Sequence, residues 1–213
     1  MRVYNKIMIN DSKIIYITSP AGSGNTYLQS FINENAYVNV NIKSHNADDI
    51  LENEYHICIL RDPMSCISSA VERHDKLNKY KHLPDEQKID LSDLYLVKKL
   101  IDEYSYQHLI FLNKIKNKKN VFFVTFENVI NNTEQVFKKI ISQLNLEINK
   151  DLPNSMNSDF IFEGMKISGL DARSPKEKSD NRKLIQELVK KNYLFIEIEK
   201  KYIEVLQSTE ITL

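Results

Sequence analysis

Short apolar runs alternate along the chain with longer segments in which apolar residues recur at helical spacing. Four of these runs are rich in β-branched and aromatic residues and have the length of buried strands. They lie at residues 13–18, 37–42, 56–60 and 120–126. The alternation predicts an α/β fold with a mainly parallel sheet, helices on both of its faces and a helical C-terminus.

The helix signals lie between and after these strand runs. They follow the first strand directly and recur at 62–73, 92–116, 133–144 and about 180–206. Asp62-Pro63 marks a helix start, because Asp caps free N–H groups and Pro is favoured at the first helical position. A short helix is expected at 48–53, and the polar residues 74–91 are typical of a long surface loop. Composition nowhere shifts sharply, so residues 1–213 are expected to form a single domain.

The charge balance limits the classes of partner. Lys and Arg together number 29, as do Asp and Glu, so the formal net charge is zero and a generally basic nucleic-acid coat protein is excluded. Any anion site must therefore be local. Cys58 and Cys66 lack the spaced Cys and His neighbours of a zinc site. No apolar run reaches the length of a membrane span, and residues 1–10 lack signal-peptide features, so a cytoplasmic protein is expected.

Glycine is scarce, and half of it lies in one loop. The chain has 4 glycines, where average usage gives roughly 15; Gly22 and Gly24 follow the first strand within Pro-Ala-Gly-Ser-Gly-Asn-Thr at 20–26. Glycines let the backbone approach an anion, and the next helix adds its positive N-terminus. Ser19 and Asn25 replace the first glycine and the lysine of the G-x-x-x-x-G-K-[ST] motif. Taken alone, the loop fits a phosphate cradle and a ligand-free turn about equally.

Two other strand ends have polar side chains. Arg61 follows the third strand and can grip a phosphate through two parallel N–H bonds, and Ser69 lies about two helical turns later. Lys43 and His45 end the second strand. Histidine is the commonest general base, and a nearby lysine can neutralise developing charge. Taken singly, each of these residues is better explained as an ordinary surface residue.

Together and in this order, the segments resemble the sulfotransferases that use 3′-phosphoadenosine 5′-phosphosulfate (PAPS). Residues 20–28 (PAGSGNTYL) resemble the family's loop P-K-S-G-T-T-W-L, and Arg61-Asp-Pro with Ser69 matches its R-[DN]-P-x₅-S signature. Residues 43–45 (KSH) resemble its catalytic K-T-H, and 126–129 (FENV) its Y-E-D-L strand end. The resemblance covers roughly residues 13–146.

The resemblance implies a role for each matching residue. The residues that would hold the 5′-phosphate and sulfonate oxygens are Gly22, Ser23, Gly24, Asn25 and Thr26. Tyr27 would stack on adenine, while Arg61 and Ser69 would bind the 3′-phosphate. His45 would be the general base, and Lys43 would stabilise charge near the transferring group. No metal is required, because fixed donors would meet the charge of the product, adenosine 3′,5′-bisphosphate.

The chain departs from the family pattern at three points. Ala21-Gly22 replace the loop lysine with one extra residue, and Phe126 replaces the tyrosine of Y-E-D-L. The C-terminal R-K-G segment that many members use on the 3′-phosphate is absent. Arg173 is expected to substitute for it, and the alternatives are Lys176, Lys178 and Arg182.

The expected function is transfer of a sulfuryl group from PAPS to a hydroxyl or amine of a small-molecule or carbohydrate acceptor, recognised by residues 73–91 and 154–175. Neither a nucleic-acid partner nor a membrane span is expected, and the oligomeric state is left open. Two alternatives stay open. One is a nucleotide or small-molecule kinase with an altered P-loop, against which Asn25 argues. The other is a catalytically silent nucleotide-binding module, suggested by the missing loop lysine.

Overall fold

The four strands of the protein form one parallel sheet. We describe the fold from a computed structural model, in which residues 15–35, 40–72, 94–146 and 180–208 are described. The strands are β1 (Ile15–Thr18), β2 (Asn41–Ser44), β3 (Tyr55–Leu60) and β4 (Val121–Thr125). They lie side by side in the order β2-β1-β3-β4, and every pairing is parallel. The predicted α/β fold is confirmed.

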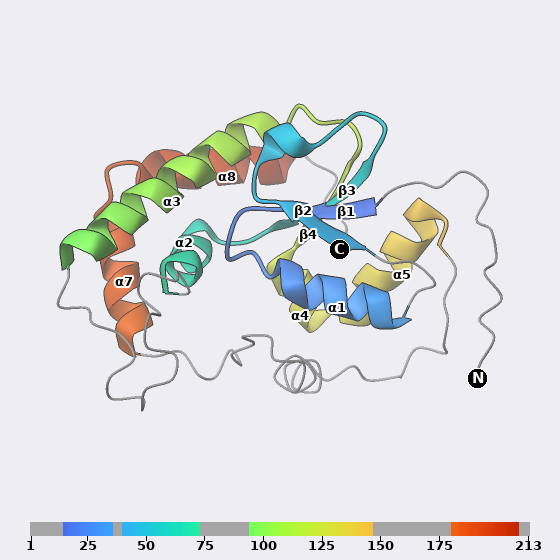
Figure 1. The fold of residues 1–213 in the computed structure, drawn as a ribbon, viewed down its shortest axis with the longest axis horizontal. Helices are drawn as coiled ribbons and strands as arrows, with labels where there is room; N and C mark the ends of the chain where they lie inside the picture. Colours follow the sequence, from blue (N-terminus) through green and yellow to red (C-terminus); the bar gives the residue numbers. More distant parts are fainter. Residues whose placement is uncertain (1–14, 36–39, 73–93, 147–179, 209–213) are drawn as a thin grey trace.

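Helices cover both faces of this sheet (Figure 1). One face packs against α1 (Asn25–Asn35), α4 (Phe126–Asn131) and α5 (Thr133–Leu144). The other packs against α2 (Pro63–Glu72), α3 (Leu94–Ile115), α7 (Asp180–Lys190), α8 (Phe195–Ser208) and the short 3₁₀ helix η1 (Ala47–Asp49). Alternate residues of β3 enter the two cores, because successive side chains of a strand point to opposite faces. Ile57 and Ile59 lie on the α1 face, whereas Cys58 and Leu60 lie on the α3 face.

The sheet has a switch point at β1, which lies between β2 and β3. Ligands of open parallel sheets bind beyond the carboxyl ends of the strands at such a point. Pairing between β1 and β2 is irregular there, because Ile17 pairs with Ile42 but Thr18 pairs with Ser44. Lys43 is therefore an extra residue, a bulge just before the end of β2.

Several predicted boundaries require correction. The second strand is described at Asn41–Ser44 rather than at 37–42, and residues 36–39 lie outside the described part. The short helix expected at 48–53 is η1 at Ala47–Asp49. Phe126 does not end β4 but begins α4, because the Thr125 side chain accepts a hydrogen bond from the Asn128 N–H and caps that helix.

The predicted single C-terminal helix is two helices, α7 and α8. Asn192 separates them: its backbone N–H donates to Val189 O at 2.9 Å, and its side-chain oxygen accepts from the Leu194 N–H at 2.9 Å. Asn side chains compete in this way with the helical backbone for hydrogen bonds. Among the described residues, no helix is both long and apolar enough to cross a bilayer.

Candidate functional site

The glycine loop connects β1 to the N-terminus of α1 and packs tightly on α2. Gly22 and Gly24 have φ values of 88° and 96°, a region that favours glycine. A Cβ at Gly22 would lie 2.2 Å from the backbone oxygen of Cys66 in α2. A Cβ at Gly24 would lie 2.7 Å from the Phe126 ring. Both positions therefore require glycine, for conformation and for space.

Arg61 joins this loop to two other strand ends. Its Nη1 donates to Gly22 O at 2.6 Å, and its guanidinium lies over the Phe126 ring, 4.1 Å from the centroid. Residues that follow β1, β3 and β4 thus meet at one place, as expected at the carboxyl edge of a parallel sheet. A flat guanidinium over an aromatic face is a favourable cation–π arrangement, so the ring and the loop together orient Arg61.

His45, which follows β2, completes the meeting of strand ends. Its Nδ1 lies 2.8 Å from Ser19 O, the first residue after β1. A carbonyl oxygen can only accept, so Nδ1 must hold the proton of this hydrogen bond. In the neutral ring Nε2 is then the nitrogen with the free lone pair. Because His45 is exposed, that nitrogen belongs to a ring that solvent can reach.

Asn25, the first residue of α1, has a buried polar atom for which the structure gives no partner. The residue is 6% exposed, and its Oδ1 has no hydrogen-bond partner among the described residues. Its Nδ2 lies 3.5 Å from His45 Nδ1, which already holds a proton. The orientation of an amide is assigned from its hydrogen bonds, so the reversed orientation is considered as well. The reversed amide would point its oxygen at His45 and leave the nitrogen unpaired instead. Either orientation leaves a buried polar atom unsatisfied at the helix N-terminus, where anions bind.

The hydroxyl and N–H groups of Ser23 are used inside the protein. The backbone N–H donates to Pro20 O at 3.2 Å, and the hydroxyl lies 3.3 Å from the Cys66 sulfur. Cys66 Sγ in turn donates to Ala21 O at 3.0 Å, so the Ser23 hydroxyl is the donor to sulfur. In this structure Ser23 therefore fixes the loop on α2. The N–H groups of the first turn of α1 have no carbonyl partner within the helix, as at any helix start.

The sulfotransferase domain family matches residues 41–210, which is more than half of the chain. The chain belongs to the sulfotransferase family. The match includes His45, Arg61 and Ser69, whereas the glycine loop at 20–26 precedes it and is defined by its own sequence and geometry. No curated protein matches the sequence.

Two predicted binding residues of this sulfotransferase are buried, and a third lies outside the described residues. Tyr27 is 3% exposed and belongs to the core between the sheet and α5, and its stacking on adenine stays a prediction. Ser69 is 1% exposed within α2. Arg173 lies outside the described residues, as do both predicted acceptor-binding loops, at 73–91 and 154–175. Thr26, by contrast, is half-buried in the first turn of α1.

Lys43 and His45 do not share a face, although regular alternation along a strand would place residues two apart on the same face. The Lys43 ammonium forms an ion pair with Glu54, directly before β3, whereas His45 turns to Ser19 beyond the end of β2. The bulge at Lys43 and the end of the strand at Ser44 separate the two directions. Arg182, an alternative for the 3′-phosphate, is likewise engaged, since its Nε donates to buried Glu72 at 2.7 Å.

Two buried histidines of this sulfotransferase were placed in predicted elements from the sequence but given no role. His56 lies in β3 and hydrogen-bonds with Glu54 and Thr18. His108 lies in α3, where burial lowers its pKa to about 4 although the charge of Asp62 opposes the shift. A histidine within an otherwise apolar strand or helix face is the signal that was available, because a buried imidazole must find partners. Among the described residues, no cluster of three His, Cys, Asp or Glu side chains could hold a metal ion.

Proposed function

We propose that this sulfotransferase uses PAPS as its donor and a hydroxyl or amine of a small-molecule or carbohydrate as its acceptor, with His45 as the general base. The observation that carries the proposal is the 2.8 Å hydrogen bond from His45 Nδ1 to Ser19 O, which directs the basic character to Nε2 beside the glycine loop. When bound, the donor supplies a sulfuryl group attached to a phosphate leaving group.

The loop residues suit the phosphosulfate end of such a donor. Gly22 and Gly24 hold backbone conformations that open an anion cradle, and α1 has 11 residues behind its N-terminus. The unsatisfied amide of Asn25 lies at that N-terminus, and Thr26 is the next residue. Arg61 lies against the same loop and supplies a fixed positive charge. These residues fit the anionic part of the donor.

His45 would take the proton of the acceptor. As the acceptor oxygen or nitrogen bonds to sulfur, its proton moves to Nε2, and the bond from sulfur to the leaving phosphate oxygen breaks with its electron pair. The hydrogen bond from Nδ1–H to Ser19 O then stabilises the positive charge of the ring. Removing a general base typically lowers turnover by about 10²- to 10⁴-fold.

Calorimetry tests the choice of donor. Adenosine 3′,5′-bisphosphate should bind more tightly than AMP or ATP, and equal affinity for the three nucleotides would refute the PAPS proposal. Arg61→Ala should weaken binding of the bisphosphate by about 1.5–3 kcal/mol, as expected for a hydrogen bond to a charged group. AMP separates two roles of Arg61: contact with the 3′-phosphate weakens only the bisphosphate, whereas support of Gly22 O weakens both ligands equally.

His45→Asn tests the general base. An Asn side chain can still donate to Ser19 O from the position of Nδ1 but has no basic nitrogen at the position of Nε2. We expect unchanged affinity for adenosine 3′,5′-bisphosphate and loss of transfer of labelled sulfate to an acceptor library. Tyr106→Ala, on an exposed position of α3, serves as a surface control. Turnover by His45→Asn at the native rate would dismiss His45 as the base.

A catalytically silent nucleotide-binding module is the second candidate. It is favoured by the combination of Ala21-Gly22 in the loop and a Lys43 that is paired with Glu54, since neither place then supplies a cation to a transferring group. This candidate predicts tight binding of adenosine 3′,5′-bisphosphate without transfer to any acceptor. Transfer in a broad acceptor screen would exclude it.

A further inference from the structure

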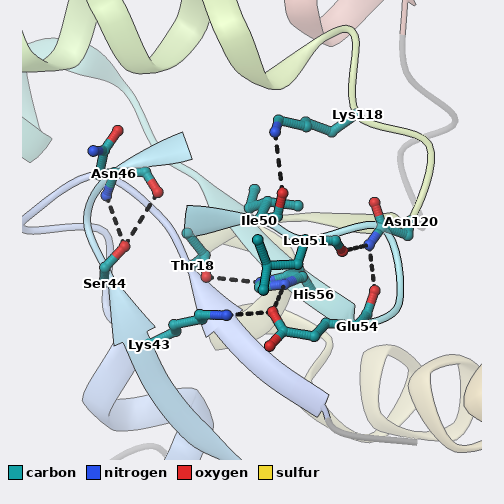
Figure 2. A network of polar contacts seen from close by, with 10 residues as sticks. All are labelled: Thr18, Lys43, Ser44, Asn46, Ile50, Leu51, Glu54, His56, Lys118 and Asn120. Carbon is teal, nitrogen blue, oxygen red and sulfur yellow. Dashed lines mark hydrogen bonds and ion pairs between the residues drawn. The ribbon is translucent and has the colours of Figure 1, made fainter. Parts of the chain in front are cut away.

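A chain of polar side chains links three strands on the α3 face of the sheet (Figure 2). Thr18 Oγ1 lies 2.8 Å from His56 Nδ1, and His56 Nε2 lies 3.1 Å from Glu54 Oε2. The same carboxylate oxygen pairs with the Lys43 ammonium, which also lies 4.8 Å from the centroid of the Tyr16 ring. The side chain of Lys43 is 22% exposed and that of Glu54 is 8% exposed.

The protons of this chain can be assigned from its donors and acceptors. The ion pair keeps Glu54 ionised: burial opposes ionisation, but hydrogen bonds from Lys43 and His56 hold the carboxyl pKa below its ordinary value. A carboxylate only accepts, so His56 Nε2 holds a proton and Nδ1 accepts from the Thr18 hydroxyl. Burial lowers the pKa of His56 below its ordinary value although Glu54 opposes the shift, so the ring is neutral.

This chain resembles a hydroxyl–histidine–carboxylate triad but cannot act as one. Thr18 is 0% exposed and His56 is 1% exposed, so no substrate reaches the hydroxyl. The side chains instead fix three strand segments relative to one another, through Thr18 of β1, Lys43 of β2 and the start of β3. Asn120 also donates to the backbone carbonyl of Glu54, which anchors the carboxylate end of the chain.

His45 lies two residues after Lys43, in a turn that links the position of His45 to that of Lys43. Ser44 Oγ accepts from the Asn46 N–H at 3.0 Å and donates to Asn46 O at 3.1 Å, which closes the turn around His45. Thr18 is likewise followed by Ser19, whose carbonyl holds His45 Nδ1. Of the two partners of the His45–Ser19 hydrogen bond, Ser19 therefore directly follows Thr18 of the buried chain. His45 is separated from Lys43 of that chain by one turn residue.

We propose that Lys43 is a positioning residue, which acts through Glu54, His56 and Thr18 to hold His45 in its Nδ1–H form on Ser19 O. This inference rests on the proposed function, because it assigns Lys43 a role in placing the general base rather than in touching the transferring group. It predicts opposite tautomers for the neutral forms of two imidazoles of one protein, Nδ1–H at His45 and Nε2–H at His56. The tautomers are properties of the free protein and need no donor or acceptor.

The first experiment measures these tautomers by two-bond ¹H–¹⁵N correlation spectra of the nucleotide-free protein, with His45→Asn and His56→Asn for assignment. Lys43→Met should abolish the Nδ1–H preference of His45, and Lys43→Arg, which can still pair with Glu54, should retain it. Lys114→Met removes an exposed ion pair with Asp48 and should change neither histidine. A His45 tautomer that is the same in Lys43→Met as in the native protein would overturn the proposal.

A variant that leaves buried Glu54 without its cationic partner can fail to fold, so the double variant Lys43→Met/Glu54→Gln is measured in parallel. If Lys43 is a positioning residue, kcat should fall by about 100-fold in Lys43→Met, in Glu54→Gln and in the double variant alike, provided that each folds. A loss of this size is typical of a reacting group misplaced by an ångström. Kd for adenosine 3′,5′-bisphosphate should stay unchanged. A direct role predicts that Glu54→Gln alone keeps kcat, and that result would also overturn the proposal. If no acceptor is found, the tautomer spectra still decide.

Discussion

Gly22→Ala should be one of the most damaging single-methyl additions in this protein. The φ of 88° at Gly22 costs an L-residue about 1–2 kcal/mol. The new Cβ would also lie 2.2 Å from the backbone oxygen of Cys66 and 3.2 Å from the backbone nitrogen of Ala70. These atoms belong to α2 and cannot rotate away as a side chain can, so overpacking adds about 1–3 kcal/mol. We expect the free energy of unfolding to fall by about 2–5 kcal/mol.

Gly24→Ala separates the strain of the backbone from the rigidity of the obstacle. Its φ of 96° carries a similar conformational cost, but the atoms that its Cβ meets belong to the Phe126 ring, at 2.7 and 2.8 Å. That ring can shift, although Arg61 lies over it at 4.1 Å. The free energy of unfolding should therefore fall less than in Gly22→Ala, by about 1–3 kcal/mol. Displacement of the ring should also disturb Arg61 and weaken nucleotide binding.

Urea unfolding monitored by circular dichroism gives the stability of both variants, and calorimetry with adenosine 3′,5′-bisphosphate gives their affinity. Ala21→Ser is the matched control, because Ala21 lies in the same loop without a positive φ. Its stability should change by no more than about 0.5 kcal/mol. If Gly22→Ala proved as stable as Ala21→Ser, the close packing of the loop on α2 would be refuted. An order reversed between Gly22→Ala and Gly24→Ala would refute the distinction between backbone and side-chain obstacles.

Three further predictions concern parts of the fold that support this site. The pKa of His108 in the folded protein is about 4, against an ordinary 6.5. The free energy of unfolding should therefore fall by roughly 3 kcal/mol from this group as pH falls from 6.5 to 4, and urea unfolding of His108→Gln should lack that slope. Arg182→Met removes an ion pair with Glu72, which is 1% exposed, so unfolding by denaturant should show a lower free energy of unfolding than in Arg182→Lys, which keeps the positive charge. Asn145 ends α5 with φ 51°, so Asn145→Gly should be neutral or stabilising, whereas Asn145→Ala should lower the melting temperature at a cost of about 1 kcal/mol.

The meeting of the four strand ends could be predicted from the sequence because it depends on few quantities. Parallel strands in successive strand–helix units place their carboxyl ends at the same edge, whatever the details of each helix. The start of α2 could be predicted for an equally local reason. The helix begins at Pro63, and Asp62 accepts a hydrogen bond from the Ser65 N–H at 2.8 Å. Local chemistry and topology are both legible in a single sequence.

The break between α7 and α8 could not be predicted, because apolar residues recur at helical spacing on both sides of it. Ile185 and Val189 of α7 enter the same core as Phe195 and Ile198 of α8. The break depends on Asn192, whose side-chain nitrogen also donates to Asp102 of α3 at 2.7 Å. That contact joins residues far apart in the sequence, and hydrophobic periodicity contains no information about it.

The direction of Lys43 shows where reasoning from one strand fails. Alternation along an extended chain places residues 43 and 45 on the same face only if the strand continues regularly. The bulge and the end of β2 at Ser44 remove that condition. Part of the competition for Lys43 was visible in the sequence. Glu54 and His56 lie two residues apart on one face, and a buried histidine requires partners on both ring nitrogens. The other half depends on the register of β1 and β2 beside β3, which only the assembled sheet defines. A lysine that matches a catalytic motif can therefore form an ion pair with a carboxylate next to a neighbouring strand, and the motif alone does not predict that pair.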